Sequence, residues 1–213
     1  MEELGQRFGD GVNAAWKELA DAAQSRFTEL FWNESTGCLF DVVSDDSRDA
    51  SIRPNRVLAV SLHHCMLPLE KATRVVAAVE RELLTPYGLR SLALSDHQYQ
   101  GRYQGDPFSR DSAYHQGTVW PWLMGPFLTA YLKVNGGSAN ARRQAAQWLS
   151  ELRRFMLEEG VGQIPEVFDG DAPHRAGGCL AQAWSVAELL RVIVEELGTA
   201  KRKRPADTLG TVA

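Results

Sequence analysis

The sequence predicts an all-α fold with a minor β component, built from pairs of helices stacked side by side. Apolar residues recur at spacings of three and four in several segments, which is typical of amphipathic helices. Short connections alternate with long ones, as they do where helical hairpins stack into toroids and solenoids. One short segment, CLFDVV at 38–43, has β character and fits one arm of a small hairpin.

About six helices follow from the apolar spacing and from the turn residues between the helical segments. The first begins near Val12 and ends at the turn sequence NESTG. Asn55 can cap the second, and Pro68 opens the third, because proline fits the first turn of a helix. The expected helical ranges are 12–30, 56–65, 69–84, 117–134, 138–158 and 179–197.

Two long segments, 85–112 and 159–178, have too many turn-forming residues for a helix. Connections of this length in compact domains are usually either functional or disordered. Three tyrosines and Phe108 in the first segment argue against disorder. We therefore expect these two loops, together with the polar loop at 44–55, to carry the chemistry of the protein.

Charge and hydropathy disfavour two classes of partner. The 213 residues include 23 Lys and Arg against 27 Asp and Glu, and no basic face of the kind that nucleic acid requires. No apolar run approaches the roughly 20 residues that span a bilayer, so no membrane partner is expected. The basic cluster KRKR at 201–204 is interpreted as a solvated, disordered tail over 198–213, with a localisation or polyanion-binding element as the alternative.

The three cysteines, Cys38, Cys65 and Cys179, are odd in number and widely spaced. They predict buried free thiols in a reducing compartment, and the absence of a signal-peptide pattern makes that compartment the cytoplasm. No pair has the spacing of a metal site or a redox motif. Neither a metal nor a cofactor is expected, and motifs of serine hydrolases, zinc peptidases and phosphate-binding loops are absent.

Polar side chains of the loops can meet at one end of a helical assembly, because each loop precedes a helix. A cleft that combines carboxylates, arginines and tryptophans is suited to a carbohydrate, whose faces stack on indole rings and whose hydroxyls pair with charged groups. The loop residues concerned are Arg53, Asn55, Arg90, Arg110, Asp111, Glu166, Asp169 and Asp171.

Glu166, in the segment QIPEVFDGD, is the strongest candidate for a catalytic carboxylate. Glycoside hydrolysis needs two carboxyl groups that flank the scissile bond. A proline precedes Glu166, and two apolar residues follow it and can hold the carboxylate in place. From composition alone, a solvated loop acid remains the alternative, and Asp169 and Asp171 lie in a DGD turn where short acids are common for backbone reasons.

The segment AYHQGTVWPW at 113–122 is expected to form the start of a helix at the edge of a pocket. His115 lies on its loop side, with a hydrogen-bonded buried histidine as the alternative. Trp120 and Trp122 are two residues apart and cannot share one face of a helix. We therefore expect Trp120 to line the site and Trp122 to pack inward.

Four segments resemble, in order, the C-terminal part of bacterial and archaeal glycogen debranching enzymes. They read IRPN with LAVSL, TPYGLRSL, RDSAYHQGTVWPWLMGPF and IPEVFDGDAPHRAGGCLAQAWSVAELLRV, and they fall within about residues 25–195. The resemblance implies an (α/α)6 barrel of which residues 1–197 form the C-terminal half. It also implies amylo-α-1,6-glucosidase chemistry, the inverting hydrolysis of α-1,6-linked glucose at branches of glycogen or limit dextrin.

The same resemblance implies the roles of individual residues. Glu166 of the IPE motif is the expected general base, which activates a water on the face opposite the leaving group. The residues implied to line or support the glucose subsite are Arg53, Asn55, Arg110, Asp111, Tyr114, His115, Trp120, Gln182 and Trp184.

The chain also departs from the family pattern. It lacks the upstream WMD motif in which the general acid is expected, and it reads RPNR, with Arg56, where relatives read RPNQ. The resemblance therefore implies a fragment, inactive alone, whose apolar faces associate with the missing half of the barrel or with another copy. Two alternatives stay open: a non-catalytic remnant that binds α-glucan or a partner, and a helical scaffold that binds no sugar.

Overall fold

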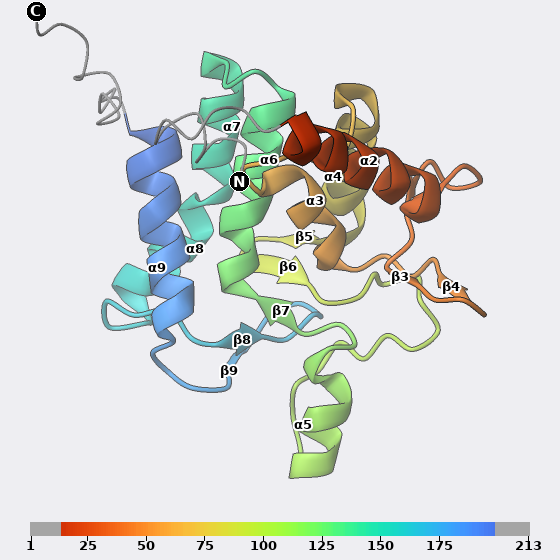
Figure 1. Ribbon diagram of the computed structural model, residues 1–213. Coiled ribbons are helices and arrows are strands. Elements are labelled where there is room, and N and C mark those ends of the chain that lie inside the picture. The colour runs from red at the N-terminus through yellow and green to blue at the C-terminus, as the bar shows by residue number, and fades with distance from the viewer. Residues whose placement is uncertain (1–13, 199–213) are drawn as a thin grey trace, which may run out of the picture.

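Most of the helices stand above a small antiparallel sheet in the computed structural model, which describes residues 14–198 (Figure 1). The α-helices are α2 (Ala14–Phe31), α3 (Leu58–Ser61), α4 (Leu69–Leu83), α5 (Pro107–Tyr114), α6 (Met124–Val134), α7 (Ala139–Trp148), α8 (Ser150–Glu158) and α9 (Ala183–Arg191). Short 3-10 helices at Pro54–Val57 and Pro121–Leu123 precede α3 and α6, and a π-helical segment at Val192–Leu197 extends α9. The helix-rich fold with a minor β component is therefore confirmed.

The larger sheet has five very short strands in the order β5-β6-β7-β8-β9, and each neighbouring pair is antiparallel. Leu89 lies opposite Trp120, and Val119 lies opposite Phe168, so the sheet joins segments that are far apart in the sequence. The strands are β5 (Leu84–Thr85), β6 (Gly88–Arg90), β7 (Val119–Trp120), β8 (Val167–Phe168) and β9 (Ala176–Gly177).

Two small hairpins follow α2 and confirm the β character of segment 38–43. In the first, β1 (Trp32–Asn33) pairs with β2 (Cys38–Leu39). In the second, β3 (Val42–Val43) pairs with β4 (Arg48–Asp49). The turn sequence NESTG joins the strands of the first hairpin, because its glycine, Gly37, takes a left-handed φ of 64°.

The hydrophobic core lies between α4, α6 and the inner face of the sheet. The ring of Phe168 on β8 is 1% exposed, stacks on Tyr87 with centroids 4.5 Å apart and meets the edge of Phe155 at 5.0 Å. Burying a ring of this size stabilises the fold by about 1.5–3 kcal/mol. The strand that directly follows Glu166 is thus fixed in the core.

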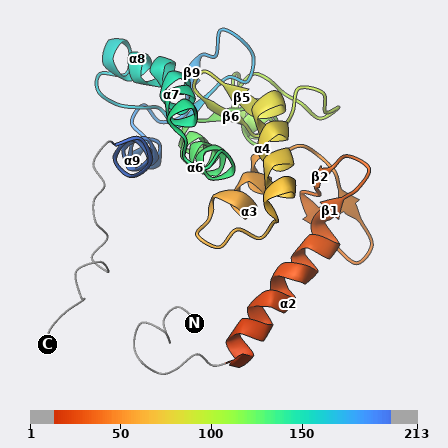
Figure 2. The same ribbon diagram turned by 90° about the horizontal axis from the view of Figure 1, so that it is seen from above.

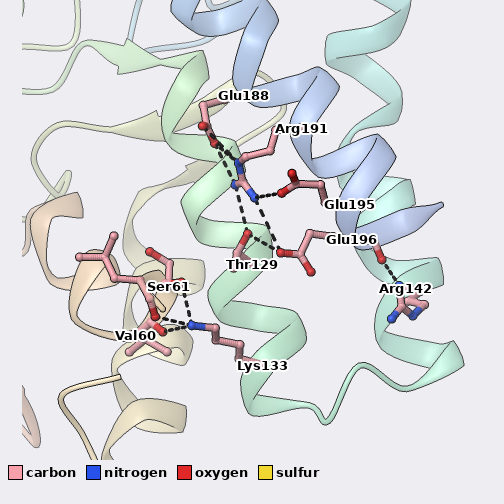
Figure 3. Close-up of polar contacts among 10 residues, drawn as sticks. Val60, Ser61, Thr129, Lys133, Arg142, Glu188, Arg191, Glu195 and Glu196 are labelled. Atoms are coloured by element: carbon pink, nitrogen blue, oxygen red, sulfur yellow. Dashed lines mark hydrogen bonds and ion pairs between the residues drawn. The ribbon is translucent and has the colours of Figure 1, made fainter. Parts of the chain in front are cut away.

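Polar contacts hold α6 between its neighbours on two sides (Figure 3). Arg191 of α9 is paired with Glu188 at 2.9 Å and donates to the hydroxyl of Thr129 on α6 at 3.2 Å. At the end of α6, Lys133 donates to the main-chain oxygen of Ser61 at 2.8 Å, where the carbonyl groups at the end of α3 lack helical partners. The C-terminal end of α9, whose start borders the candidate site described below, is thereby anchored to α6.

The segment 85–112 contains a helix that the sequence analysis did not predict. Pro107 occupies the first turn of α5, and the carboxylate of Asp106 accepts a hydrogen bond from the main-chain nitrogen of Ser109 at 2.8 Å. This capping of a free N–H group stabilises a short helix whose composition is otherwise unfavourable. The expectation of a loop without secondary structure was therefore wrong.

Four expected helices are shorter or interrupted, and the last of them begins at Ala183 rather than at 179. The one expected from 117 begins at Met124, because Pro121 and the pairing of β7 with two neighbouring strands hold residues 119–123 out of an α-helix. The one expected over 138–158 is broken at Leu149 into α7 and α8. The helix expected over 56–65 contains only one α-helical turn, α3, which follows the 3-10 helix at Pro54–Val57.

The cysteines are free, as predicted, but their burial differs. Cys38 is buried, Cys65 is half-buried and Cys179 is exposed, because Cys179 lies in the loop before α9 rather than in a helix. The predicted basic tail at 201–204 and the first residues of the expected N-terminal helix lie outside the described residues. Within residues 14–198, no helix is both long and apolar enough to cross a membrane.

Candidate active site

A cavity of about 400 Å³ opens between the 3-10 helix at Pro54–Val57, the segment 115–123 and the start of α9. Indole rings and a few polar groups share its wall, which is typical of small-molecule sites. Half of the predicted site residues line it: Arg53, Asn55, His115, Trp120 and Trp184. The other lining residues are Pro54, Ser91, Trp122 and Leu123. We call this space the tryptophan cavity.

Three indole rings give the cavity its name. Trp122 and Trp184 stack with centroids 4.1 Å apart, and Trp120 lies parallel to the ring of His115 at 5.5 Å. The expectation that Trp122 packs away from the site was wrong. Trp120 ends strand β7 and Trp122 lies in the following 3-10 helix, so the α-helical geometry on which that expectation rested does not apply here.

Arg53 anchors the opposite side of the cavity to the segment that carries His115. Its Nη1 donates to the main-chain oxygens of Ser91 at 3.3 Å and His115 at 2.6 Å. Its Nη2 donates to Oε1 of Gln116 at 2.8 Å. The guanidinium is therefore held in one orientation, with most of its N–H groups in use.

Glu166 does not line the tryptophan cavity. One of its carboxylate oxygens accepts a hydrogen bond from the hydroxyl of Tyr114, and the other accepts from the main-chain nitrogen of Cys179 at 3.1 Å. Tyr114 in turn meets Trp120 edge-on at 4.6 Å. The predicted base is thus one side chain away from the cavity, and Tyr114 lies between them.

Burial raises the pKa of the Tyr114 hydroxyl well above its usual range, and the hydrogen bond to the Glu166 carboxylate raises this pKa further. The hydroxyl therefore stays protonated at neutral pH and acts as a donor to Glu166. Tyr114 was expected to line or support the glucose subsite; it does not line the tryptophan cavity, and it contacts both Trp120 and Glu166.

Arg110 and Asp111 do not reach the tryptophan cavity. Both are exposed on α5, which projects from the body of the molecule at its lower end (Figure 1). Arg110 donates to the main-chain oxygen of Gly105 at 3.3 Å, within its own segment. Gln182 also lies outside the cavity: its main-chain nitrogen donates to the oxygen of Ile164 at 2.9 Å and ties the start of α9 to the segment before Glu166.

Two acids of the DGD turn hold the loop at 99–104. The carboxylate of Asp169 is buried and accepts hydrogen bonds from the main-chain nitrogen of Tyr103 at 2.7 Å and from Gln104 at 2.6 Å. The carboxylate of Asp171 accepts one from the hydroxyl of Tyr99 at 3.0 Å. Sequence reasoning treated these acids mainly as turn formers and missed that they connect two loops.

The pH dependence of stability offers a test of this connection. Burial and the hydrogen bond to Asp171 raise the pKa of Tyr99 to about 12. In the unfolded chain the hydroxyl ionises near pH 10, so its contribution is complete below that pH and declines as the pH rises toward 12. We expect the urea midpoint of the wild type to fall more steeply between pH 10 and 11 than that of Tyr99→Phe. Equal slopes for both proteins would contradict the assignment.

The side chains that commonly bind metal ions do not cluster in the part of the chain that the structure describes. Within residues 14–198, no three His, Cys, Asp or Glu side chains lie close enough together to hold a metal ion.

Comparison with known proteins gives three findings. A family model described as amylo-alpha-1,6-glucosidase matches residues 1–191. The glycogen debranching enzyme of Saccharomyces cerevisiae (strain ATCC 204508 / S288c) is 29% identical over 161 residues, which cover 67% of this chain and 10% of that enzyme. Neutral trehalase from the same yeast aligns with a TM-score of 0.60 at 20% identity, over 83% of this chain and 30% of the trehalase chain. The trehalase likeness shows a shared fold, and the chain spans only a minor part of either relative.

Proposed function

The chain belongs to the amylo-alpha-1,6-glucosidase family, and from this premise we propose that the tryptophan cavity binds an α-linked glucose residue of a glycogen-type glucan. The observation that carries the proposal is the arrangement of the cavity wall. Stacked indole rings share the lining with Arg53 and Asn55, and a pyranose ring presents both an apolar face and hydroxyl groups. The family and the similarity to the yeast debranching enzyme support a debranching role.

For the reaction, we propose that Glu166 is the general base of an inverting hydrolysis. Inversion places two carboxyl groups on opposite sides of the scissile bond, about 6.5–9.5 Å apart, with a water beside the base. Tyr114 donates to Glu166 and orients its carboxylate, leaving lone pairs free for a water proton. Through Tyr114, this base is also connected to Trp120 of the cavity lining.

We propose further that residues 1–197 form half of an (α/α)6 barrel and that the general acid comes from the other half. Seen from above, α2 and α9 lie at opposite sides of the molecule (Figure 2). Each of these helices exposes large apolar residues, among them Trp16 and Leu19 on α2 and Leu190 on α9. Apolar surface of this kind favours association, with the missing half or with a second copy.

The isolated chain tests the sugar-binding part of this proposal. We expect it to bind methyl α-glucoside with millimolar affinity in an NMR titration and to release no glucose from a limit dextrin in a glucose-oxidase assay. Trp184→Ala should weaken binding about tenfold, because it removes half of a stacked indole pair. Leu190→Ala is the matched control, since this residue is exposed on the same helix and lies outside the tryptophan cavity.

Other outcomes separate the alternatives. Glucose release that Glu166→Gln abolishes would contradict an acid outside this chain. A folded sample that binds no glucoside would favour the helical scaffold. A second candidate function, non-catalytic glucan binding, is favoured because Glu166 does not line the tryptophan cavity. Binding of long glucans by the Glu166→Gln variant at full strength is compatible with this second function.

A further inference from the structure

Asp41 lies directly behind the polar side of the tryptophan cavity. Its side chain is 5% exposed. One carboxylate oxygen accepts a hydrogen bond from Nδ2 of Asn55 at 3.1 Å, and the other lies 3.9 Å from Nε of Arg53. Both of these partners line the cavity, whereas Asp41 itself does not.

The carboxylate of Asp41 fixes the orientation of the side-chain amide of Asn55. An ionised carboxylate can only accept hydrogen bonds, so the nitrogen of the amide must point toward it. The amide oxygen, Oδ1, is then directed away from Asp41. Among residues 14–198 no group donates a hydrogen bond to this oxygen, and Asn55 is exposed at the rim of the cavity.

Arg53 supplies the complementary group. Its two Nη1 protons are directed at main-chain oxygens, one Nη2 proton is directed at Gln116, and Nε faces Asp41. A guanidinium carries five N–H protons, so one Nη2 proton remains for a ligand. Pro54 separates Arg53 from Asn55, and both side chains line the cavity, where Arg53 offers a donor and Asn55 an acceptor.

We infer that Asp41 is a positioning residue that fixes the hydrogen-bond polarity of the tryptophan cavity and thereby selects a vicinal diol. One ligand hydroxyl donates to Oδ1 of Asn55, and its neighbour accepts from Arg53. Adjacent hydroxyls of a hexose meet both requirements, whereas a ligand with two acceptors and no donor does not. This inference rests on the proposed sugar-binding function.

The wild-type chain alone provides the first test. Affinities are measured by NMR titration for methyl α-glucoside and for its monodeoxy and monofluoro analogues. Fluorine accepts weakly but cannot donate, so at one position the fluoro and deoxy analogues should both bind about tenfold more weakly than the parent. At an adjacent position, the fluoro analogue should keep more affinity than the deoxy analogue. Tolerance of fluorine at every position would overturn the inference.

A reciprocal swap provides the second test. In Asp41→Asn, the new amide can donate to Asn55 and allows its amide group to turn round, so binding should weaken about tenfold. In the double variant Asp41→Asn with Asn55→Asp, the amide at position 41 donates to the carboxylate at position 55, which again offers an oxygen to the cavity. Binding should return to within about threefold of the wild type, which a merely structural role of Asp41 would not produce.

The control variant is Asp45→Asn, which removes a carboxylate from an exposed position of the same polar loop. A double variant as weak as the single one, in a sample whose circular dichroism matches the wild type, would overturn the inference. If the wild type binds no glucoside at all, the proposed function itself fails, and this outcome is distinct from binding that is insensitive to Asp41.

Discussion

Replacing Phe168 by alanine is expected to lower the free energy of unfolding by about 3–5 kcal/mol, the usual cost of removing a fully buried aromatic ring. The ring is 1% exposed, stacks on Tyr87 and meets Phe155 edge-on, so its loss leaves a cavity in the hydrophobic core. Urea denaturation followed by circular dichroism measures the change.

The matched control is Phe108→Ala, because the ring of Phe108 is 81% exposed on α5. A solvent-exposed ring contributes little, so its removal should change stability by less than about 0.5 kcal/mol. Equal losses for the two variants would show that β8 is not anchored in the core as described.

Replacing Gly117 by alanine is expected to cost at least about 3 kcal/mol and to abolish binding in the tryptophan cavity. Gly117 has a φ of 139°, and an added Cβ would lie 2.6 Å from the ring of Tyr99 and 2.7 Å from the main-chain oxygen of Gln100. Backbone atoms cannot yield as a flexible side chain can. The strain would displace His115 and Trp120 on either side.

Gly136→Ala separates the two causes of this loss. Gly136 also has a left-handed φ, of 60°, but an added Cβ there meets no atom within 4 Å. We expect this variant to lose only about 1–2 kcal/mol, from backbone strain alone, and to keep its glucoside affinity. Differential scanning fluorimetry and the NMR titration provide the two readouts, and equal effects of the two substitutions would exclude the clash.

The sequence pattern alone was sufficient to predict the elements that are stabilised mainly by residues close to one another in the sequence. The helix now labelled α4 was predicted within one residue at either end, because its apolar residues repeat at helical spacing and a proline opens it. Helix α5 was missed because it depends on a cap, Asp106, that looks in the sequence like any loop acid. Residues 117–123 were misassigned because partner strands distant in the sequence hold residues 119–120 extended and a 3-10 helix begins at Pro121.

The candidate site was predictable in composition but not in arrangement. Family motifs led to Arg53, Asn55, His115, Trp120 and Trp184, which the fold brings to one cavity. Trp122 was excluded by an assumption of helical geometry, although Pro121 restricts Trp120 to an extended backbone and was a usable signal. The hydrogen bond between Tyr114 and Glu166 joins residues 52 positions apart, and no local pattern encodes it.

The five-stranded sheet has a consequence for how such a protein can diverge. Its strands are two or three residues long, and their pairing uses main-chain N–H and C=O groups, which every residue except proline supplies. The frame that aligns segments 88–90, 119–120 and 167–168 therefore persists when outward-facing side chains are exchanged. Mutation can alter the lining of the tryptophan cavity, and so its ligand, while the alignment of the segments around it is inherited unchanged.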